Sequence, residues 1–159
     1  MEGFMMRVIN LLDDNKAEYS VQEFSSVYTA QQLAAETHTP GANVLKTVIL
    51  HMNKRYIMAV IPADHRLDLE QLTLVLGGNA KPELVAESEL PDLCDDADTG
   101  AEAPFGELYG METVMEGSLH NSEHEVVFLS GSHRRAIRMP VTEYVRIADP
   151  ILAPISKHL

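Results

Sequence analysis

The sequence predicts a mixed α/β fold of the α+β type, with several helices inserted among the strands of a largely antiparallel mixed sheet. Two dense β-branched and aliphatic runs, Val44 to Leu50 and Arg55 to Ile61, flank a short polar turn, so we expect paired central strands. Segments with helical apolar spacing and capping residues surround them, and short strand-like runs follow. Helices mixed with strands in this order indicate the α+β class.

The first half of the chain supplies the predicted helices. Val8, Leu11 and Leu12 share one helical face, while Thr29 and Asp68 stand where N-caps of two further helices are expected. The expected elements are, in order, a helix over residues 7–15, a strand over 19–24, a helix over 30–36, the two central strands, a helix over 69–76 and a short helical turn over 88–93.

The second half begins with a loop and continues with short strands. Residues 95–106 have neither helical nor strand periodicity, and their Gly and Pro spacing predicts a defined loop. The β candidates that follow are residues 113–115, 125–129, 135–139 and 144–147.

Length and composition predict one domain over residues 1–159. The 159 residues suffice to bury a sizeable core, and 45% of them are hydrophobic. The apolar stretches are far shorter than the roughly 20 residues of a spanning helix, so no membrane partner is expected. The N-terminus lacks the layout of a signal peptide, and the single cysteine forms no disulfide framework. A cytoplasmic location is therefore expected.

The net charge of the chain argues against extensive, sequence-independent binding of nucleic acid. Lys and Arg number 12 against 24 Asp and Glu, a net charge of −12, whereas sequence-independent binding neutralises many phosphates. Any contact with nucleic acid should be local. The basic residues available for one are Lys46, Lys54, Arg55, Arg134, Arg135 and Arg138, and the alternative interpretation is a scatter of solvated surface charges.

Lys46 and a glycine-rich loop stand out. Lys46 lies inside an apolar strand, where a buried ammonium is costly unless it reaches water or an anion; the alternative is the solvent face of a half-buried strand. In the loop Gly100 to Gly106, glycine permits unusual backbone angles and proline fixes the exit direction. Such a loop can aim N–H groups at a carbonyl oxygen that gains charge, although a plain surface connection is the alternative.

These segments together resemble the YbaK and prolyl-tRNA-synthetase editing-domain family over most of the chain. Tyr28 to Ala34 is similar to the family's helix after the first strand, and Leu45 to Val48 to the strand with its key lysine. Gly100 to Gly106 matches the family's GxxxP loop. Gly131, after Ser130, stands where the family often has a glycine that opens its late strands.

The resemblance implies a YbaK-like fold and a trans-editing hydrolase that deacylates mischarged aminoacyl-tRNA at the ester of its 3′ adenosine. It implies the tRNA acceptor end as partner, with an aminoacyl-tRNA synthetase as a second candidate partner. No cofactor or metal is expected. Lys46 and Gly100 would be the catalytic residues, and the substrate-binding residues would be Ala101, Glu102, Ala103, Pro104, Phe105, Gly106, Gly131 and His133.

Two positions depart from the family pattern. Glu102 stands where the family loop usually carries a small or hydroxyl residue, and it can repel phosphate or bind a substrate's amino group. Many family members have a Lys-Arg pair after the glycine that corresponds to Gly131, whereas this sequence has Ser132-His133. For His133 the resemblance therefore implies only a place in the pocket. The alternative function is a non-catalytic module of the same fold that binds tRNA or a synthetase.

Other chemistry is less favoured. Cys94 precedes two acidic residues that disfavour its thiolate, so packing is the preferred role. His120 and His124 have an i, i+4 spacing that can bind zinc on a helix, but the turn expected between them and the lack of a third ligand favour a solvated loop.

Overall fold

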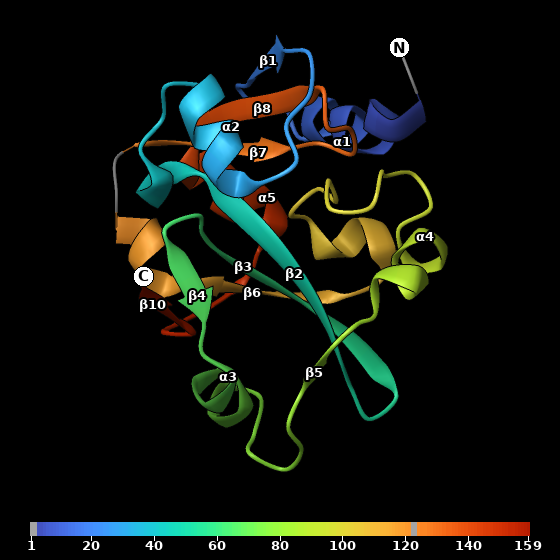
Figure 1. Cartoon of the computed structure of the whole chain (residues 1–159), viewed down its shortest axis with the longest axis vertical. Coiled ribbons are helices and arrows are strands. Elements are labelled where there is room, and N and C mark those ends of the chain that lie inside the picture. The colour runs from blue at the N-terminus through green and yellow to red at the C-terminus, as the bar shows by residue number, and fades with distance from the viewer. Residues whose placement is uncertain (1–2, 122–123) are drawn as a thin grey trace.

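The fold consists of two larger sheets and one two-stranded pair with helices packed against them, as a computed structural model shows for residues 3–121 and 124–159 (Figure 1). Its elements are, in chain order, α1 (Gly3–Asp14), β1 (Ser20–Glu23), α2 (Ala30–Glu36), β2 (Leu45–Met52), β3 (Arg55–Pro62), β4 (His65–Leu67), α3 (Leu69–Val75), β5 (Glu83–Leu84), α4 (Leu90–Leu93), β6 (Glu112–Glu116), β7 (Glu125–Leu129), β8 (Arg135–Pro140), α5 (Val141–Ala148), β9 (Ile151–Ala153) and β10 (Ser156–His158).

The predicted central pair of strands is confirmed. β2 and β3 pair antiparallel from Leu45 opposite Pro62 to Met52 opposite Arg55. They lie in a five-stranded sheet of order β5-β2-β3-β6-β9, and a three-stranded sheet has the order β1-β8-β7. Only the pairs β3-β6 and β6-β9 among these named strands are parallel, so the expected largely antiparallel mixed sheet is also confirmed.

The predicted helix caps form as expected. The Thr29 hydroxyl accepts the N–H of Gln32 at 3.0 Å, and the Gln32 side chain accepts the N–H of Thr29 at 3.2 Å. This reciprocal capping box satisfies two of the N–H groups that the first turn of α2 leaves free. Asp68 likewise accepts the N–H of Gln71 at 3.2 Å and caps α3.

The strand predicted over residues 144–147 is wrong, because this segment belongs to helix α5. Its Tyr and Val residues favour a strand by composition. However, its buried residues are Val141, Tyr144 and Ile147, a spacing of three that places them on one face of a helix. Pro140 is the N-cap residue with φ −58°, and its missing N–H removes no hydrogen bond of the helix.

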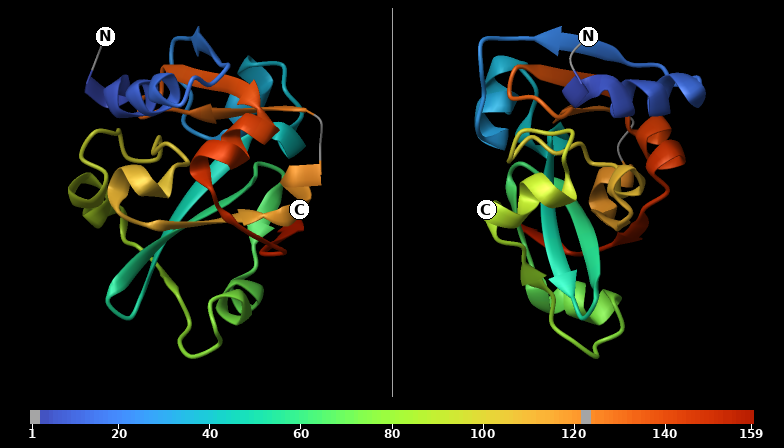
Figure 2. Two further views of the ribbon diagram at one scale, coloured as in Figure 1. Left: turned by 180° about the vertical axis from the view of Figure 1, so that it is seen from behind. Right: turned by 90° about the vertical axis from the view of Figure 1, so that its right-hand side faces the viewer.

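The main core lies between the two sheets. It takes Val8 and Leu12 from α1, and its buried aromatic side chains are Phe105, Phe128 and Tyr144. Figures 1 and 2 place the three-stranded sheet, α1 and α2 at one end of the molecule and α3 at the other. The described part of the chain contains no helix long and apolar enough to cross a membrane.

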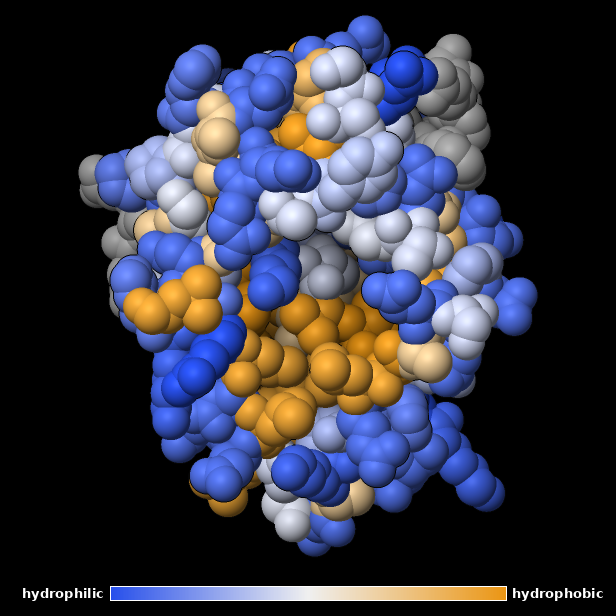
Figure 3. Space-filling view, viewed as in Figure 1, coloured by the Kyte–Doolittle hydropathy of each residue, from blue (hydrophilic) through white to orange (hydrophobic). Residues whose placement is uncertain are grey.

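A second apolar cluster covers the opposite face of the five-stranded sheet. Leu50 and Ile57 are buried beneath Leu72 of α3, while Val48 and Leu76 stay partly exposed around them. Figure 3, in the view of Figure 1, shows an apolar area over the region between β2, β4 and α3. The two faces of β2 therefore lie in different apolar clusters.

Candidate active site

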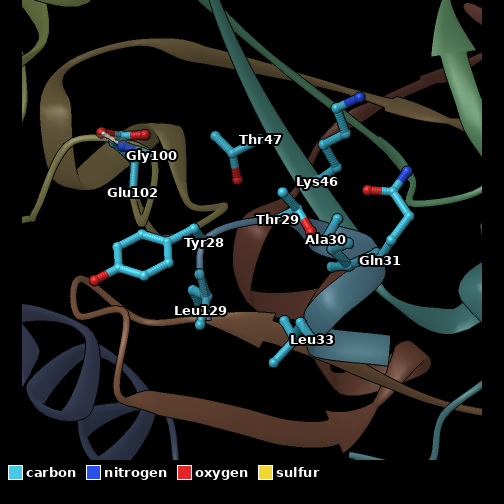
Figure 4. A pocket seen from close by; sticks show the side chains of 11 residues that line it. Tyr28, Thr29, Ala30, Gln31, Leu33, Lys46, Thr47, Gly100, Glu102 and Leu129 are labelled. Carbon is cyan, nitrogen blue, oxygen red and sulfur yellow. Dashed lines mark hydrogen bonds between the residues drawn. The ribbon is translucent and has the colours of Figure 1, made fainter. Parts of the chain in front are cut away.

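A pocket of about 300 Å³ lies where β2, the start of α2 and the loop around Gly100 meet (Figure 4). It brings together Lys46, Gly100 and Glu102, which are far apart along the chain. The strand with the lysine and the loop with the glycines, which are separate in the sequence, therefore meet in one pocket. The lining residues are Tyr28, Thr29, Ala30, Gln31, Leu33, Leu45, Lys46, Thr47, Gly100, Glu102 and Leu129.

Lys46 reaches the pocket from the beginning of β2. Its strand neighbour Leu45 is buried in the main core, while Lys46 itself is half-buried and lies opposite Ile61 of β3. Within residues 3–121 and 124–159 its ammonium has no ion pair and no hydrogen bond. The charge is thus held on a rigid strand and left available to a ligand.

The loop around Gly100 is held by backbone hydrogen bonds. The N–H of Asp98 donates to Gly131 O at 2.8 Å, and the N–H of Gly131 donates to Ala101 O at 2.7 Å. The N–H of Ala101 donates to Asp98 O at 2.9 Å. Gly100 has φ +92°, a conformation that side chains other than glycine's rarely adopt. Gly131 therefore supports the loop from behind and does not line the pocket.

The N–H of Gly100 donates to Oε2 of Glu102 at 2.9 Å (Figure 4). This N–H is therefore placed to bind a negatively charged oxygen at the pocket wall. Glu102 is only 6% exposed. Burial raises the pKa of its carboxyl, against the lowering effect of the Gly100 N–H and of the nearby His133.

His133 lies outside the pocket lining and contacts two of the chain segments that flank the pocket. Its Nδ1 lies 2.8 Å from Val27 O and its Nε2 lies 2.9 Å from Thr99 O. These two contacts tie the ring to the segment before α2 and to the loop around Gly100. The ring also lies 5.0 Å from that of Tyr28. The structure thus places His133 behind the pocket, where it fixes the peptide between Thr99 and Gly100.

The remaining loop residues lie in the core under the pocket. Ala101 and Ala103 are buried, the Tyr144 hydroxyl donates to Pro104 O, and the Phe105 ring lies 5.1 Å from that of Tyr144. A Cβ on Gly106 would lie 2.4 Å from a backbone oxygen, so this position requires glycine. None of these five residues lines the pocket, and their expected contribution is to support the loop.

Most lining residues lie in the segments of the family resemblance, but only Lys46, Gly100 and Glu102 among them were predicted as site residues. Of the other lining residues, Tyr28 and Gln31 lie at the start of α2, Thr47 follows Lys46 on β2, and Leu129 ends β7. Only the capping sequence that begins at Thr29 carries a local signal, because it fixes where α2 starts. Tyr28 stands just before this cap and is 70% exposed, unusual for a large aromatic side chain.

Other reactive groups lie apart from the pocket lining. Burial raises the pKa of the Cys94 thiol to about 12, assisted by the acidic Glu102 and Asp96, so its thiolate is disfavoured. Among the residues that the structure describes, no three His, Cys, Asp or Glu side chains gather as a metal site would require. His120 lies in a short 3-10 helix and His124 just before β7.

We expect Glu102→Gln to raise the melting temperature at neutral pH. Burial raises the pKa of this carboxyl in the folded chain, so the folded state binds a proton before the unfolded state as the pH falls. The charge therefore costs stability above the raised pKa, and the cost disappears below the ordinary value. Thermal melts of both proteins between about pH 4 and pH 8 check this. A glutamine variant that is less stable at neutral pH would contradict it.

Comparison with known proteins gives one family and several similar structures. The family described as "Aminoacyl-tRNA editing domain" matches residues 25–147. Multifunctional Ser/Thr-tRNA deacylase ProXp-y of Escherichia coli strain K12 is 24% identical over 150 residues, which cover 92% of this chain and 89% of the relative. The protein of the same name in Escherichia coli O157:H7 has the same identity and coverage.

The fold is shared with solved structures. The crystal structure of a candidate trans-editing enzyme for prolyl-tRNA synthetase superposes with a TM-score of 0.86. The match covers 99% of each chain at 18% sequence identity. This similarity confirms the predicted fold class.

Proposed function

Because the chain belongs to the aminoacyl-tRNA editing domain family, we propose that it is a trans-acting deacylase of mischarged aminoacyl-tRNA. The reaction is hydrolysis of the ester that joins the amino acid to the 3′ adenosine. The observation that carries the proposal is the common pocket of Lys46 and Gly100, with a pre-aligned N–H on its wall.

In the proposed mechanism the Gly100 N–H stabilises the oxygen of the attacked carbonyl. Water adds to the carbonyl carbon, and the C–O bond to the ribose then breaks. The proton of the water goes to the departing ribose oxygen, assisted by the neighbouring ribose hydroxyl. A fixed N–H dipole lowers the barrier because it needs no reorganisation as charge develops. The φ of +92° at Gly100 and the bond from His133 to Thr99 O support this donor's orientation.

Lys46 is proposed to hold the acceptor end of the tRNA. An ammonium on a flexible stem acts as a point charge toward a phosphate or the ester oxygen. With a net charge of −12 the protein should bind tRNA by such local contacts rather than over a wide surface. A synthetase that delivers the tRNA is a compatible partner.

The substrate is proposed to carry a small amino acid. A pocket of about 300 Å³ must hold both the aminoacyl group and part of the adenosine, which excludes large side chains. Since a relative with 24% identity is named a Ser/Thr-tRNA deacylase, seryl and threonyl esters are the first to test.

A non-catalytic module that binds tRNA or a synthetase is the second candidate function. It is favoured by the bond between the Gly100 N–H and Glu102, because this carboxylate occupies the donor that catalysis requires. A deacylation screen of the purified protein against a panel of mischarged tRNAs separates the two functions. Turnover of at least one ester supports the deacylase, and binding without turnover of any supports the module.

We expect Cys94→Ser and chelation of divalent metals to leave deacylation nearly unchanged. The thiol is buried with a raised pKa, and the proposed mechanism uses neither a thiolate nor a metal. Single-turnover rates with and without a chelator measure both effects. A loss of more than about tenfold, or roughly 1.4 kcal/mol in the barrier, would reveal chemistry that this mechanism lacks.

A further inference from the structure

Glu102 is a buried carboxylate without an ion pair among the described residues. It is 6% exposed, and no nitrogen of Lys, Arg or His in the described residues forms an ion pair with it. Its bond from the Gly100 N–H compensates only part of the cost of removing the charge from water. A ligand that brings a cation would complete this site.

The charges of the pocket have a defined arrangement. Of the lining residues only Lys46 and Glu102 are charged, and Figure 4 shows them on opposite sides of the pocket. Outside the lining, His133 lowers the pKa of Glu102 and Asp98 raises it, while Glu102 in turn raises the pKa of Cys94. The side of the pocket formed by the loop is therefore suited to a positive group and the side formed by β2 to a negative one.

An aminoacyl ester of RNA has this arrangement of charges. Its α-ammonium is positive, while the nucleotide that carries the ester has phosphates. The amine nitrogen is two bonds from the ester carbonyl carbon. A site that binds both groups must therefore place an anion directly beside the N–H for the carbonyl oxygen, as Glu102 lies beside Gly100.

We propose that Glu102 binds the free α-ammonium of the ester and selects aminoacyl esters over N-acylated esters such as peptidyl or formylated ones. This inference rests on the proposed deacylase function. An ammonium offers three hydrogen-bond donors and a full charge, whereas an N-acyl amide offers one donor and no charge. In this proposal Oε2 leaves the Gly100 N–H as the carboxylate turns to the ammonium, and the N–H then donates to the carbonyl oxygen.

The first test compares seryl-tRNA with N-acetylseryl-tRNA as substrates of the wild type and of Glu102→Gln. The wild type should hydrolyse the free-amine ester with a kcat/KM about tenfold or more above that of the acetylated ester. In Glu102→Gln most of this preference should be lost, because hydrolysis of the free-amine ester slows while that of the acetylated ester stays the same. Glu107→Gln is the matched control, because it removes an exposed carboxylate just after the same loop and should keep the ratio.

A second test does not depend on turnover. Binding of the 3′-seryl amide of 3′-amino-3′-deoxyadenosine and of its N-acetyl form is measured by titration. The wild type should prefer the free amine, and Glu102→Gln should bind both alike. Equal binding of the two ligands by the wild type would overturn the inference, as would equal loss for both in a folded Glu102→Gln. If no ester is hydrolysed but the amide preference holds, the deacylase proposal fails and recognition of the amine stands.

Discussion

Gly100→Val is expected to lower single-turnover deacylation by about 100-fold or more, with a much smaller effect on substrate binding. Gly100 has φ +92°, which a β-branched residue adopts only with strain. Relief of that strain rotates the peptide between Thr99 and Gly100, whose N–H is the proposed donor to the ester oxygen. A built Cβ would lie 3.5 Å from the His133 ring, an ordinary van der Waals contact, so the expected loss comes from the backbone strain.

Gly78→Val is the matched control for this change. Gly78 also has a positive φ of +75°, but it follows α3 and a built Cβ meets no atom within 4 Å. Both variants should therefore lose some thermal stability, whereas only Gly100→Val should lose turnover. Melting temperature and single-turnover rate are measured on the same preparations. Normal chemistry in Gly100→Val would remove this loop from the active site.

Elements with strong local signals could be predicted from the sequence. The capping box of Thr29 and Gln32 and the cap at Asp68 depend on residues three positions apart, so the helix starts are visible in the sequence. The hairpin of β2 and β3 depends on two long apolar runs and a turn between them. These elements place Lys46 correctly on a central strand.

Elements that depend on tertiary packing could not be predicted in this way. The segment of α5 is rich in strand-favouring residues, but Tyr144 is fixed by its place in the main core and its bond to Pro104 O. β4, β5, β9 and β10 have two or three residues each, too few for an alternating pattern to show. Their partners, far away in the chain, determine that they are strands.

The candidate site was predictable only in part for a similar reason. A lysine inside an apolar strand and a Gly and Pro loop are local anomalies, and they led to Lys46 and Gly100. The position of Glu102 beside the Gly100 N–H and the bridge from His133 to Val27 and Thr99 exist only in three dimensions. No spacing in the sequence distinguishes a histidine behind a pocket from one that lines it.

Lys46→Ala is expected to lower kcat/KM by roughly 10- to 100-fold, because a charged hydrogen bond to the substrate contributes about 1.5 to 3 kcal/mol. The fold should stay intact, since the ammonium has no ion pair in the described part of the chain and the side chain is half-buried. Circular dichroism and melting temperature test the fold. Unchanged turnover in a folded variant would exclude Lys46 from the site.

The salt dependence distinguishes a phosphate contact of Lys46 from a contact with the ester alone. If Lys46 neutralises a phosphate, Lys46→Ala should reduce the slope of log kcat/KM against log salt by about one. Lys54→Ala is the matched control, because Lys54 is exposed at the far end of the same hairpin and should change neither rate nor slope. A lower rate with an unchanged slope in Lys46→Ala would place the ammonium at the ester. An equal effect of Lys54→Ala would mean that the hairpin acts through its overall charge, and the specific role of Lys46 would then be wrong.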